Sequence, residues 1–299
     1  MPHFVGGSAD LAPSTSTLIK DGGSVGKHAF AGRNLHYGVR EHGMAAIVNG
    51  MCLHRGFSVY GATFLVFSDY CRPSLRLAAI MEVPAITVFT HDSIFLGEDG
   101  PTHQAVEHLA ALRAIPNMTV IRPADANETS YAWLAALQHR TGPTCLILTR
   151  QNVPVLDRVD CAPASGHLKG AYTIWESAPN PKVLLIATGS EVAVALAAAR
   201  QLASDPGLRV RVVSMPSWEL FERQEPAYRE SVLPPTCTRR ISVEAGISQG
   251  WARYVGSTGL SIAIDRYGAS APATVLAEEF GFTPAKVLVR IREYLACSA

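Results

Sequence analysis

Short apolar runs that are typical of buried strands alternate with helical patterns along almost the whole chain. The strand candidates are residues 3–9, 84–90, 118–124, 144–150, 182–189, 208–215, 239–246 and 260–268. The helix candidates are residues 40–56, 126–140, 190–203 and 284–295. A parallel strand is reached through a crossover that is usually a helix. The alternation therefore predicts an α/β protein with parallel or mixed sheets covered by helices.

A chain of 299 residues is long enough for about two domains of ordinary size. The stretch that follows residue 150 is polar, contains two prolines and has no clear period up to residue 172. We therefore expect a first α/β domain over residues 1–155, a linker over 156–172 and a smaller α/β domain over 173–299.

Charge and cysteine usage narrow the class of protein. The formal net charge is +1, so the chain has neither a basic footprint for nucleic acid nor an acidic tail. Its six cysteines are scattered without a CxxC pair, as in reduced cytosolic proteins. No apolar run reaches the ~18 residues of a membrane span, and the first residues do not resemble a signal peptide. A soluble, cytoplasmic protein is expected.

The loop after the apolar run 84–90 is unusually rich in titratable groups. It contains His91, Asp92, Glu98, Asp99 and His103. In open α/β sheets, ligands bind outside the carboxyl ends of the strands. A solvated turn would explain either histidine alone, whereas the whole cluster favours a binding site. The spacing matches no standard zinc pattern.

Other candidate residues are ambiguous by themselves. Glu41 stands in the first turn of a predicted helix, where the dipole stabilises any carboxylate, or where a buried carboxylate could bond a heteroaromatic nitrogen. Phe64, Phe67 and Tyr70 recur at helical spacing, which is typical of a core face, but they could also bracket a flat ring. Arg150 at a strand end is either a surface charge or a phosphate ligand.

The loop after the first strand places two glycines next to Ser8, Asp10 and Ser14. It could bring backbone amides close to a ligand or form an ordinary capped turn. It matches neither GxGxxG nor a P-loop, so it predicts no nucleotide site.

Ten short motifs stand in the order found in transketolases, and the chain resembles that family over nearly its whole length. They are GGSADLAPS (6–14), HYGVREHGMAAI (36–47), ATFLVFSDY (62–70), THDSIFLGEDGPTHQ (90–104), MTVIRPADANE (118–128), LILTRQN (146–152), IATGSEV (186–192), RVVSMPSWELF (211–221), VEAG (243–246) and GASAPA (268–273). The resemblance implies a pyrimidine-binding domain followed by the C-terminal domain of the family. It also implies thiamine diphosphate with Mg²⁺ or Ca²⁺ as cofactors.

Roles for individual residues follow from the same resemblance. Glu41 is similar to the catalytic glutamate that contacts the aminopyrimidine ring. Asp10, Phe64, Phe67 and Tyr70 are similar to the other residues of that cofactor pocket.

The loop after residues 84–90, which is rich in titratable groups, is similar to the family's substrate channel. The resemblance implies that His91, Asp99 and His103 contact the sugar, with His103 also catalytic. It further implies that Ser14, His91 and Arg150 hold the sugar phosphate. Phe95 and Ala105 depart from the family's glycine and proline, and Phe95 could narrow the channel or pack against a dimer face.

The family's motif for the metal and the diphosphate is not among the ten. We therefore expect a C-terminal chain of a split or truncated transketolase that needs a complementary diphosphate-binding chain, which would carry the metal ligands. It would transfer a two-carbon ketol unit between sugar phosphates, as in the pentose phosphate pathway, and would be inactive alone. A homodimer or four-chain assembly is expected.

Two other interpretations stay open from the sequence. One is a different thiamine enzyme, such as dihydroxyacetone synthase or the beta chain of a 2-oxo-acid dehydrogenase. The other is a dimeric scaffold or regulatory remnant without catalysis.

Overall fold

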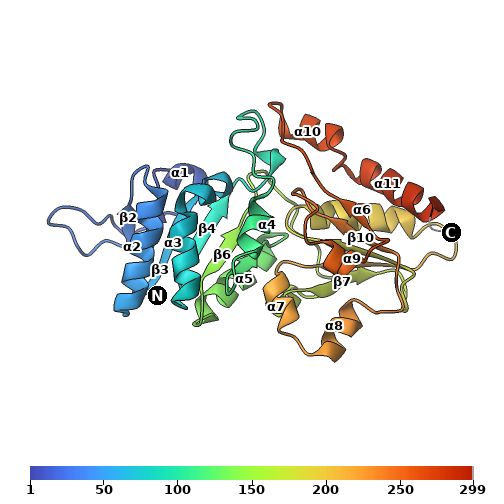
Figure 1. The fold of residues 1–299 in the computed structure, drawn as a ribbon, viewed down its shortest axis with the longest axis horizontal. Helices are drawn as coiled ribbons and strands as arrows, with labels where there is room; N and C mark the ends of the chain where they lie inside the picture. Colours follow the sequence, from blue (N-terminus) through green and yellow to red (C-terminus); the bar gives the residue numbers. More distant parts are fainter. Residues whose placement is uncertain (298–299) are drawn as a thin grey trace.

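The computed structural model describes residues 1–297 and contains two sheets that follow one another along the chain (Figure 1). The first sheet has the order β2-β1-β3-β4-β6-β5, and all its strand pairs are parallel. Its strands are β1 (Phe4–Ser8), β2 (Asn34–His36), β3 (Ser58–Phe64), β4 (Ile86–Thr90), β5 (Thr119–Ile121) and β6 (Thr144–Ile147). The α/β class and the parallel sheet are confirmed.

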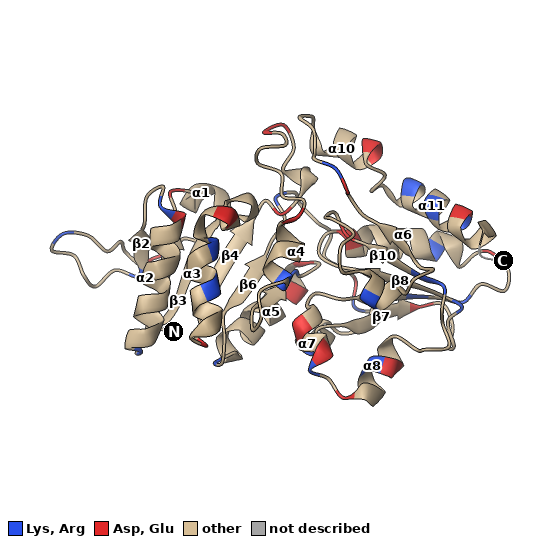
Figure 2. Cartoon of the chain, in the orientation of Figure 1, with Lys and Arg blue, Asp and Glu red and all other residues tan. Residues whose placement is uncertain are grey.

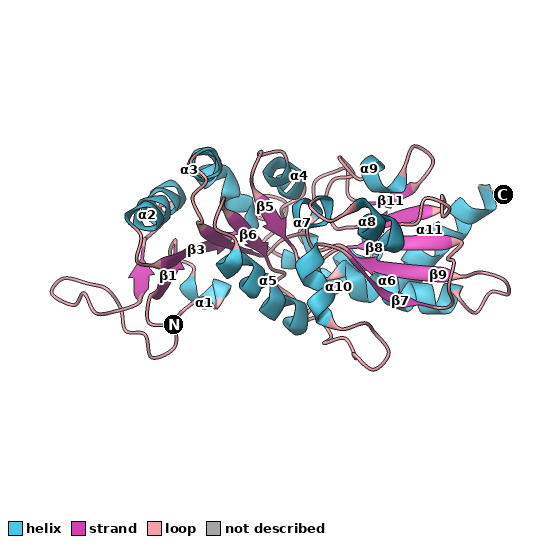
Figure 3. Cartoon of the chain, turned by 90° about the horizontal axis from the view of Figure 1, so that it is seen from below, coloured by secondary structure: helices cyan, strands magenta, loops and turns pink. Residues whose placement is uncertain are grey.

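Helices cover both faces of the first sheet, because its strands are apolar on both sides. They are α1 (Ala12–Thr15), α2 (Glu41–His54), α3 (Ser68–Ile80), α4 (His108–Arg113) and α5 (Ala126–Gln138), with the short helices η1 (Leu65–Phe67) and η2 (Ile94–Leu96). Figure 3 shows α2, α3 and α4 on one face and α1 and α5 on the other. The Asp125 carboxylate caps α5 by accepting from the Glu128 amide at 2.8 Å.

The second sheet has the order β11-β10-β8-β9-β7 and is mixed, since β7 runs antiparallel to β9. Its strands are β7 (Tyr172–Glu176), β8 (Val183–Ala187), β9 (Val210–Ser214), β10 (Arg240–Val243) and β11 (Leu260–Ile262). Its helices are η3 (Ala164–Lys169), α6 (Glu191–Leu202), α7 (Trp218–Glu222), α8 (Pro226–Val232), α9 (Ala252–Val255), α10 (Ala273–Glu279) and α11 (Pro284–Cys297). The predicted mixed-sheet second domain is confirmed.

Two local predictions are wrong for the same reason. Phe64 was expected on a helical face, but it ends the central strand β3, which pairs with β1 and β4. A helical period over residues 40–56 places Met44, Ile47 and Val48 on one face and predicts that all three are buried, yet Ile47 is 49% exposed while the other two are buried. A spacing of three apolar residues thus predicts neither the type of element for Phe64, which is buried on a strand, nor the burial of Ile47, because tertiary contacts decide both.

Phe95 also differs from both expectations. Its ring packs edge-on against Phe282, with the ring centroids 6.3 Å apart, and it belongs to the apolar core of the second domain. The bulky side chain therefore fills the junction between the two domains.

Charged residues of both signs are interspersed over the helices and loops (Figure 2). Among residues 1–297, no helix combines the length and the apolar character needed to cross a bilayer.

Candidate active site

Two neighbouring cavities lie at the carboxyl-terminal edge of the first sheet. The first, here called the Glu41 cavity, has a volume of about 430 Å³ and is lined by Ala9, Asp10, Leu11, Val39, Glu41, Phe67 and Tyr70. The second, the Arg150 cavity, has a volume of about 600 Å³ and is lined by Ser14, Thr15, Ser16, Thr90, His91, Leu148, Thr149 and Arg150. Because parallel strands end at one edge, the loops after β1, β4 and β6 meet there.

A row of stacked rings connects the two cavities. The Phe64 ring lies 3.8 Å from the His91 ring and 5.8 Å from the Phe67 ring, measured between centroids. Phe67 in turn stacks on Tyr70 at 5.7 Å. The His103 ring meets Phe67 edge-on, also at 5.7 Å. The row thus runs from His91 in the Arg150 cavity to Tyr70 in the Glu41 cavity.

Glu41 is the first residue of α2, where the unpaired amides of the helix end favour a negative charge. Its side chain is only 8% exposed. Within residues 1–297, no hydrogen bond to its carboxylate is found. A nearly buried carboxylate that lines a cavity and keeps its acceptor capacity is suited to bonding a ligand.

Asp10 lies at the turn that leaves β1 and has a left-handed backbone with φ of 63°. The turn is held by Ser8, whose hydroxyl donates to the Ala62 carbonyl at 2.9 Å and accepts from the Leu11 amide at 3.1 Å. The Asp10 carboxylate is exposed and free to meet a ligand in the Glu41 cavity.

His91 also has a left-handed backbone, with φ of 59°, directly after β4. Its Nδ1 is 2.9 Å from the Thr90 hydroxyl. Burial, followed by the positive charge of Arg150, lowers the pKa of His91, and Asp92 and Asp99 oppose that shift. The ring is therefore held neutral near pH 7, when it can donate through one nitrogen and accept through the other.

Asp99 and His103 lie on the long loop between β4 and α4. Asp99 is exposed and close enough to act on the charge of His91, but it lines neither cavity. His103 is half-buried beside Phe67, and its Nδ1 is 2.9 Å from the Thr102 hydroxyl. The structure thus brings His91 and His103 to the aromatic row, whereas Asp99 is exposed and contacts neither the rings nor the two cavities in the described residues.

The structure also contains functional candidates that the sequence did not reveal. Arg122, which the sequence did not single out, donates from Nε to Asp92 at 2.8 Å, and both side chains are buried. His108 Nε2 lies 3.1 Å from Asp69 Oδ2 at the surface between α3 and α4, and Glu107 is nearby. An arginine directly after an apolar strand was the only sequence signal for the first of these contacts.

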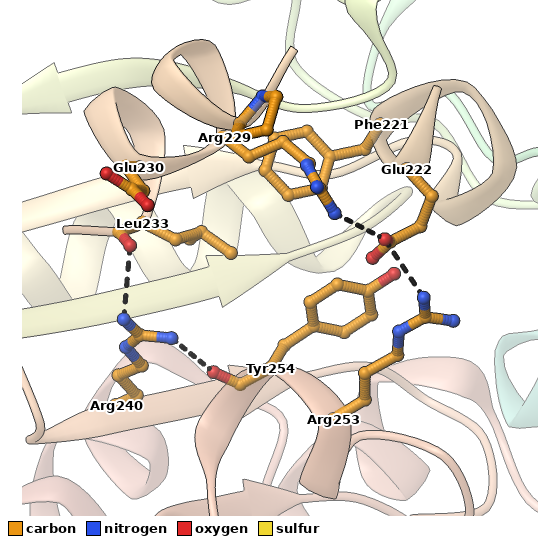
Figure 4. A pocket seen from close by; sticks show the side chains of 9 residues that line it. Phe221, Glu222, Arg229, Glu230, Leu233, Arg240, Arg253 and Tyr254 are labelled. Carbon is orange, nitrogen blue, oxygen red and sulfur yellow. Dashed lines mark hydrogen bonds and ion pairs between the residues drawn. The ribbon is translucent and has the colours of Figure 1, made fainter. Parts of the chain in front are cut away.

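A separate cavity of about 350 Å³ lies in the second domain (Figure 4). Arg229 and Arg253 both donate to Glu222 there, at 2.8 and 2.9 Å. Arg240 is held by backbone carbonyl oxygens, among them that of Leu233 at 3.1 Å. Its lining residues all belong to the second domain, so this cavity is not part of the candidate site at the strand ends of the first sheet.

The fold and the two cavities define an α/β protein whose site combines a carboxylate, stacked rings and an arginine outside the carboxyl ends of parallel strands. A family model described as "Transketolase, pyrimidine binding domain" matches residues 1–155. A second, described as "Transketolase-like TK C-terminal domain", matches residues 170–283. The chain belongs to the transketolase family.

Curated relatives agree with the family models. A transketolase of Geobacillus stearothermophilus is 54% identical over 296 residues, which are 99% of this chain and 44% of that protein. One of Aquifex aeolicus is 52% identical over 293 residues, which are 98% of this chain and 42% of that protein. The chain therefore spans less than half the length of these relatives.

Solved structures match over the same extent. A transketolase from Leishmania mexicana superimposes with a TM-score of 0.93 at 44% identity, covering 98% of this chain and 43% of that one. A chain described as a split gene transketolase, inactive beta4 tetramer, has a TM-score of 0.76 at 23% identity, covering 99% of this chain and 93% of that one. At that identity the second likeness concerns the fold alone.

Proposed function

We propose that this chain forms the aminopyrimidine and sugar-phosphate half of a transketolase site. Together with a complementary diphosphate-binding domain, it transfers a two-carbon ketol unit from a ketose phosphate to an aldose phosphate. The observation that carries the proposal is the Glu41 cavity, which the aromatic row joins directly to the Arg150 cavity.

The Glu41 cavity fits the aminopyrimidine ring of thiamine diphosphate. Phe67 and Tyr70 offer faces for offset stacking with a flat ring. The nearly buried Glu41 carboxylate can bond a ring nitrogen, and Asp10, on the turn after β1, lines the same cavity. When bound, the cofactor supplies the electron sink for breaking the carbon–carbon bond beside the ketose carbonyl. Glu41 and His103 are the proposed catalytic residues.

The Arg150 cavity fits a sugar phosphate. The guanidinium of Arg150 can hold phosphate oxygens by paired N–H donors, and the Ser14 hydroxyl adds a further donor. The neutral His91 ring can donate to a phosphate or sugar oxygen. Asp99 and His103 are the proposed contacts of the remaining sugar hydroxyls.

The diphosphate group and its Mg²⁺ or Ca²⁺ are assigned to the complementary domain, with which this chain forms a dimer or a four-chain assembly. Exposed apolar side chains on α2 and α3 support a contact surface beside the Glu41 cavity. They are Ile47, Leu53, Tyr70, Leu77 and Ile80. Neighbouring helices that expose such residues are typical of an interface. The division into domains at 1–155 and 173–299, with a linker between them, is part of this proposal.

Calorimetric titration of thiamine diphosphate with Mg²⁺ tests the proposal, first into this chain alone and then into its mixture with a diphosphate-binding domain. We expect binding, and ketol transfer between sugar phosphates, only in the mixture. The Glu41→Ala chain in the same mixture should bind far more weakly. Absence of binding in the wild-type mixture would overturn the proposal. Strong turnover by the chain alone would show that it needs no complementary diphosphate-binding domain for activity.

A further inference from the structure

The loop over residues 91–104 carries three of the proposed sugar contacts, and hydrogen bonds at its start, tip and far end link it to the second domain, directly or through Arg122. We infer that Arg122 is a positioning residue, which fixes the start of this loop to the second domain so that His91, Asp99 and His103 stay aligned with the site. The assignment of those three residues rests on the proposed function. The role of Arg122 in holding the loop is independent of the proposed function.

Arg122 is completely buried between the domains. Its Nε donates to Asp92 Oδ2 at 2.8 Å, and Asp92 directly follows His91. Its Nη1 donates to both oxygens of Thr188, each at 2.9 Å, and to Glu191 Oε2. One guanidinium therefore ties the first residues of the loop to the segment between β8 and α6.

The backbone around Arg122 is fixed to the second domain as well. Its amide donates to the Pro216 carbonyl at 2.8 Å, and its carbonyl accepts from the Gly189 amide at 3.1 Å. Glu191 is held in turn by the Ala245 amide at 2.9 Å. Because every partner is buried and fixed, the guanidinium has little freedom to move, and Asp92 shares that restriction.

The far end and the tip of the loop are held from the same side. Gln104 Nε2 donates to the Gly97 carbonyl at 2.8 Å and to the Ala269 carbonyl at 2.9 Å. The Ser270 hydroxyl donates to the Glu98 carbonyl. Arg122 thus completes a set of three attachments by which the second domain holds the loop.

Gly189 makes the approach of Arg122 possible. It has φ of 56°, and a Cβ there would lie 2.5 Å from Arg122 Cζ. Gly189→Ala would displace the guanidinium without removing any charged group from the chain. Gly207→Ala is the matched control, because Gly207 has φ of 79° and its Cβ would meet nothing within 4 Å.

Hydrogen–deuterium exchange of the full chain tests the inference without any activity. Several loop amides bond within the loop, such as those of Leu96, Gly97, Gly100 and His103. We expect peptides covering 93–104 to exchange at least about tenfold faster in Arg122→Met and Gly189→Ala, which corresponds to ~1.4 kcal/mol of lost protection. Gly207→Ala should leave these peptides unchanged.

Arg113→Met is the second control. Arg113 makes a buried bidentate pair with Glu244, also between the domains, at 2.9 and 2.7 Å, but it does not contact Asp92. If Arg113→Met loosens the loop as much as Arg122→Met, the effect is general destabilisation and the inference is wrong. Unchanged exchange in both Arg122→Met and Gly189→Ala would overturn it as well.

In the mixture with a diphosphate-binding domain, Gly189→Ala should lower kcat by up to about 100-fold, since misplacement by about 1 Å has that effect. The affinity for thiamine diphosphate should stay unchanged, because the Glu41 cavity does not touch Arg122. If the wild-type mixture is inactive, the proposed function fails while the exchange result still decides the role of Arg122. Normal kcat in a variant with a loosened loop would show that the attachment does not serve the site.

Discussion

The two cavities and the domain junction use the same residue types in opposite ways. In the cavities, Glu41 and Arg150 face open volume, and Glu41 has no hydrogen bond among the described residues. At the junction, Arg122, Glu191 and Glu244 are buried, and hydrogen bonds from several elements hold them. Charged groups that face a cavity are suited to binding a ligand, whereas buried groups bonded from several elements fix the geometry of the chain, although Arg122 Nη2 and Asp92 Oδ1 have no partner among the described residues.

The largest effect on stability is expected at the junction. Glu191→Ala removes the carboxylate that pairs with buried Arg122 and accepts from the Ala245 amide. Breaking a buried ion pair by removing one partner costs about 3–5 kcal/mol, and Arg122 keeps Asp92 as its other partner, so the free energy of unfolding should fall by about 3 kcal/mol in urea denaturation. Arg229→Met, which breaks a half-exposed pair with Glu222, should lose no more than about 1 kcal/mol. Similar losses of stability in both variants would show that the buried charges at the junction contribute no more to stability than a half-exposed ion pair.

A pH effect is expected from His167 in η3, which is completely buried. Neither ring nitrogen has a hydrogen-bond partner in the described part of the chain, and burial lowers its pKa to about 4. The unfolded state binds a proton near pH 6.5, so stability should be constant above that pH and fall by about 3 kcal/mol between pH 6.5 and pH 4.

Denaturation of His167→Gln at several pH values measures this effect. The variant should lose less stability than the wild type as the pH is lowered. An identical pH dependence in the two chains would show that another group is responsible. His91 has a lowered pKa too, but the nearby carboxylates of Asp92 and Asp99 oppose the shift, so we expect a smaller contribution from it.

Glu41 should matter little for folding and much for function. Glu41→Ala removes one favourable contact with the helix dipole, which is worth about 0.3–1 kcal/mol. In the mixture with a diphosphate-binding domain, turnover should fall by about 10²–10⁴, the usual contribution of a positioned acid–base group. Glu41→Gln keeps the shape of the side chain and removes its charge, so it distinguishes the effect of the charge from the effect of the side chain's volume. A loss of several kcal/mol in stability would place Glu41 with the structural charges instead.

The smallest effect on stability is expected at Arg150. The side chain is exposed, so Arg150→Gln should change the free energy of unfolding by less than about 0.5 kcal/mol. The KM for a sugar phosphate should nevertheless rise about 10–100-fold, as expected when a charge-assisted hydrogen bond is lost. A matched substrate without the phosphate should show no change. Equal effects on both substrates would argue against a phosphate contact.

Much of the arrangement was predictable from local patterns. The alternation of apolar runs and helical patterns predicted the α/β class, and the position of the polar loop after residues 84–90 predicted a site at a strand end. Both follow from short-range rules, because burial on a strand and capping of a helix involve neighbouring residues. Phe64, Phe67 and Tyr70 were expected on one helical face, and they do form one row of rings, although Phe64 joins it from a strand.

The contacts of Arg122 were not predictable in this way. Its partners are Asp92 in the loop after β4 and Thr188 and Glu191 in the segment after β8, both far from residue 122 in the sequence. No local period relates such residues, and a buried arginine reads in sequence like an exposed one. Phe95 was misjudged for the same reason, since its partner Phe282 lies in the other domain.

The sequence by itself determined the class of fold, the family and the residue types at the site, because these depend on composition, local order and the spacing of motifs. Only the tertiary structure decided that one row of rings connects the Glu41 and Arg150 cavities, and that residues of the second domain bond the loop over residues 91–104. Those features depend on which distant segments pack together, and buried charges acquire their roles only once packing removes water from them.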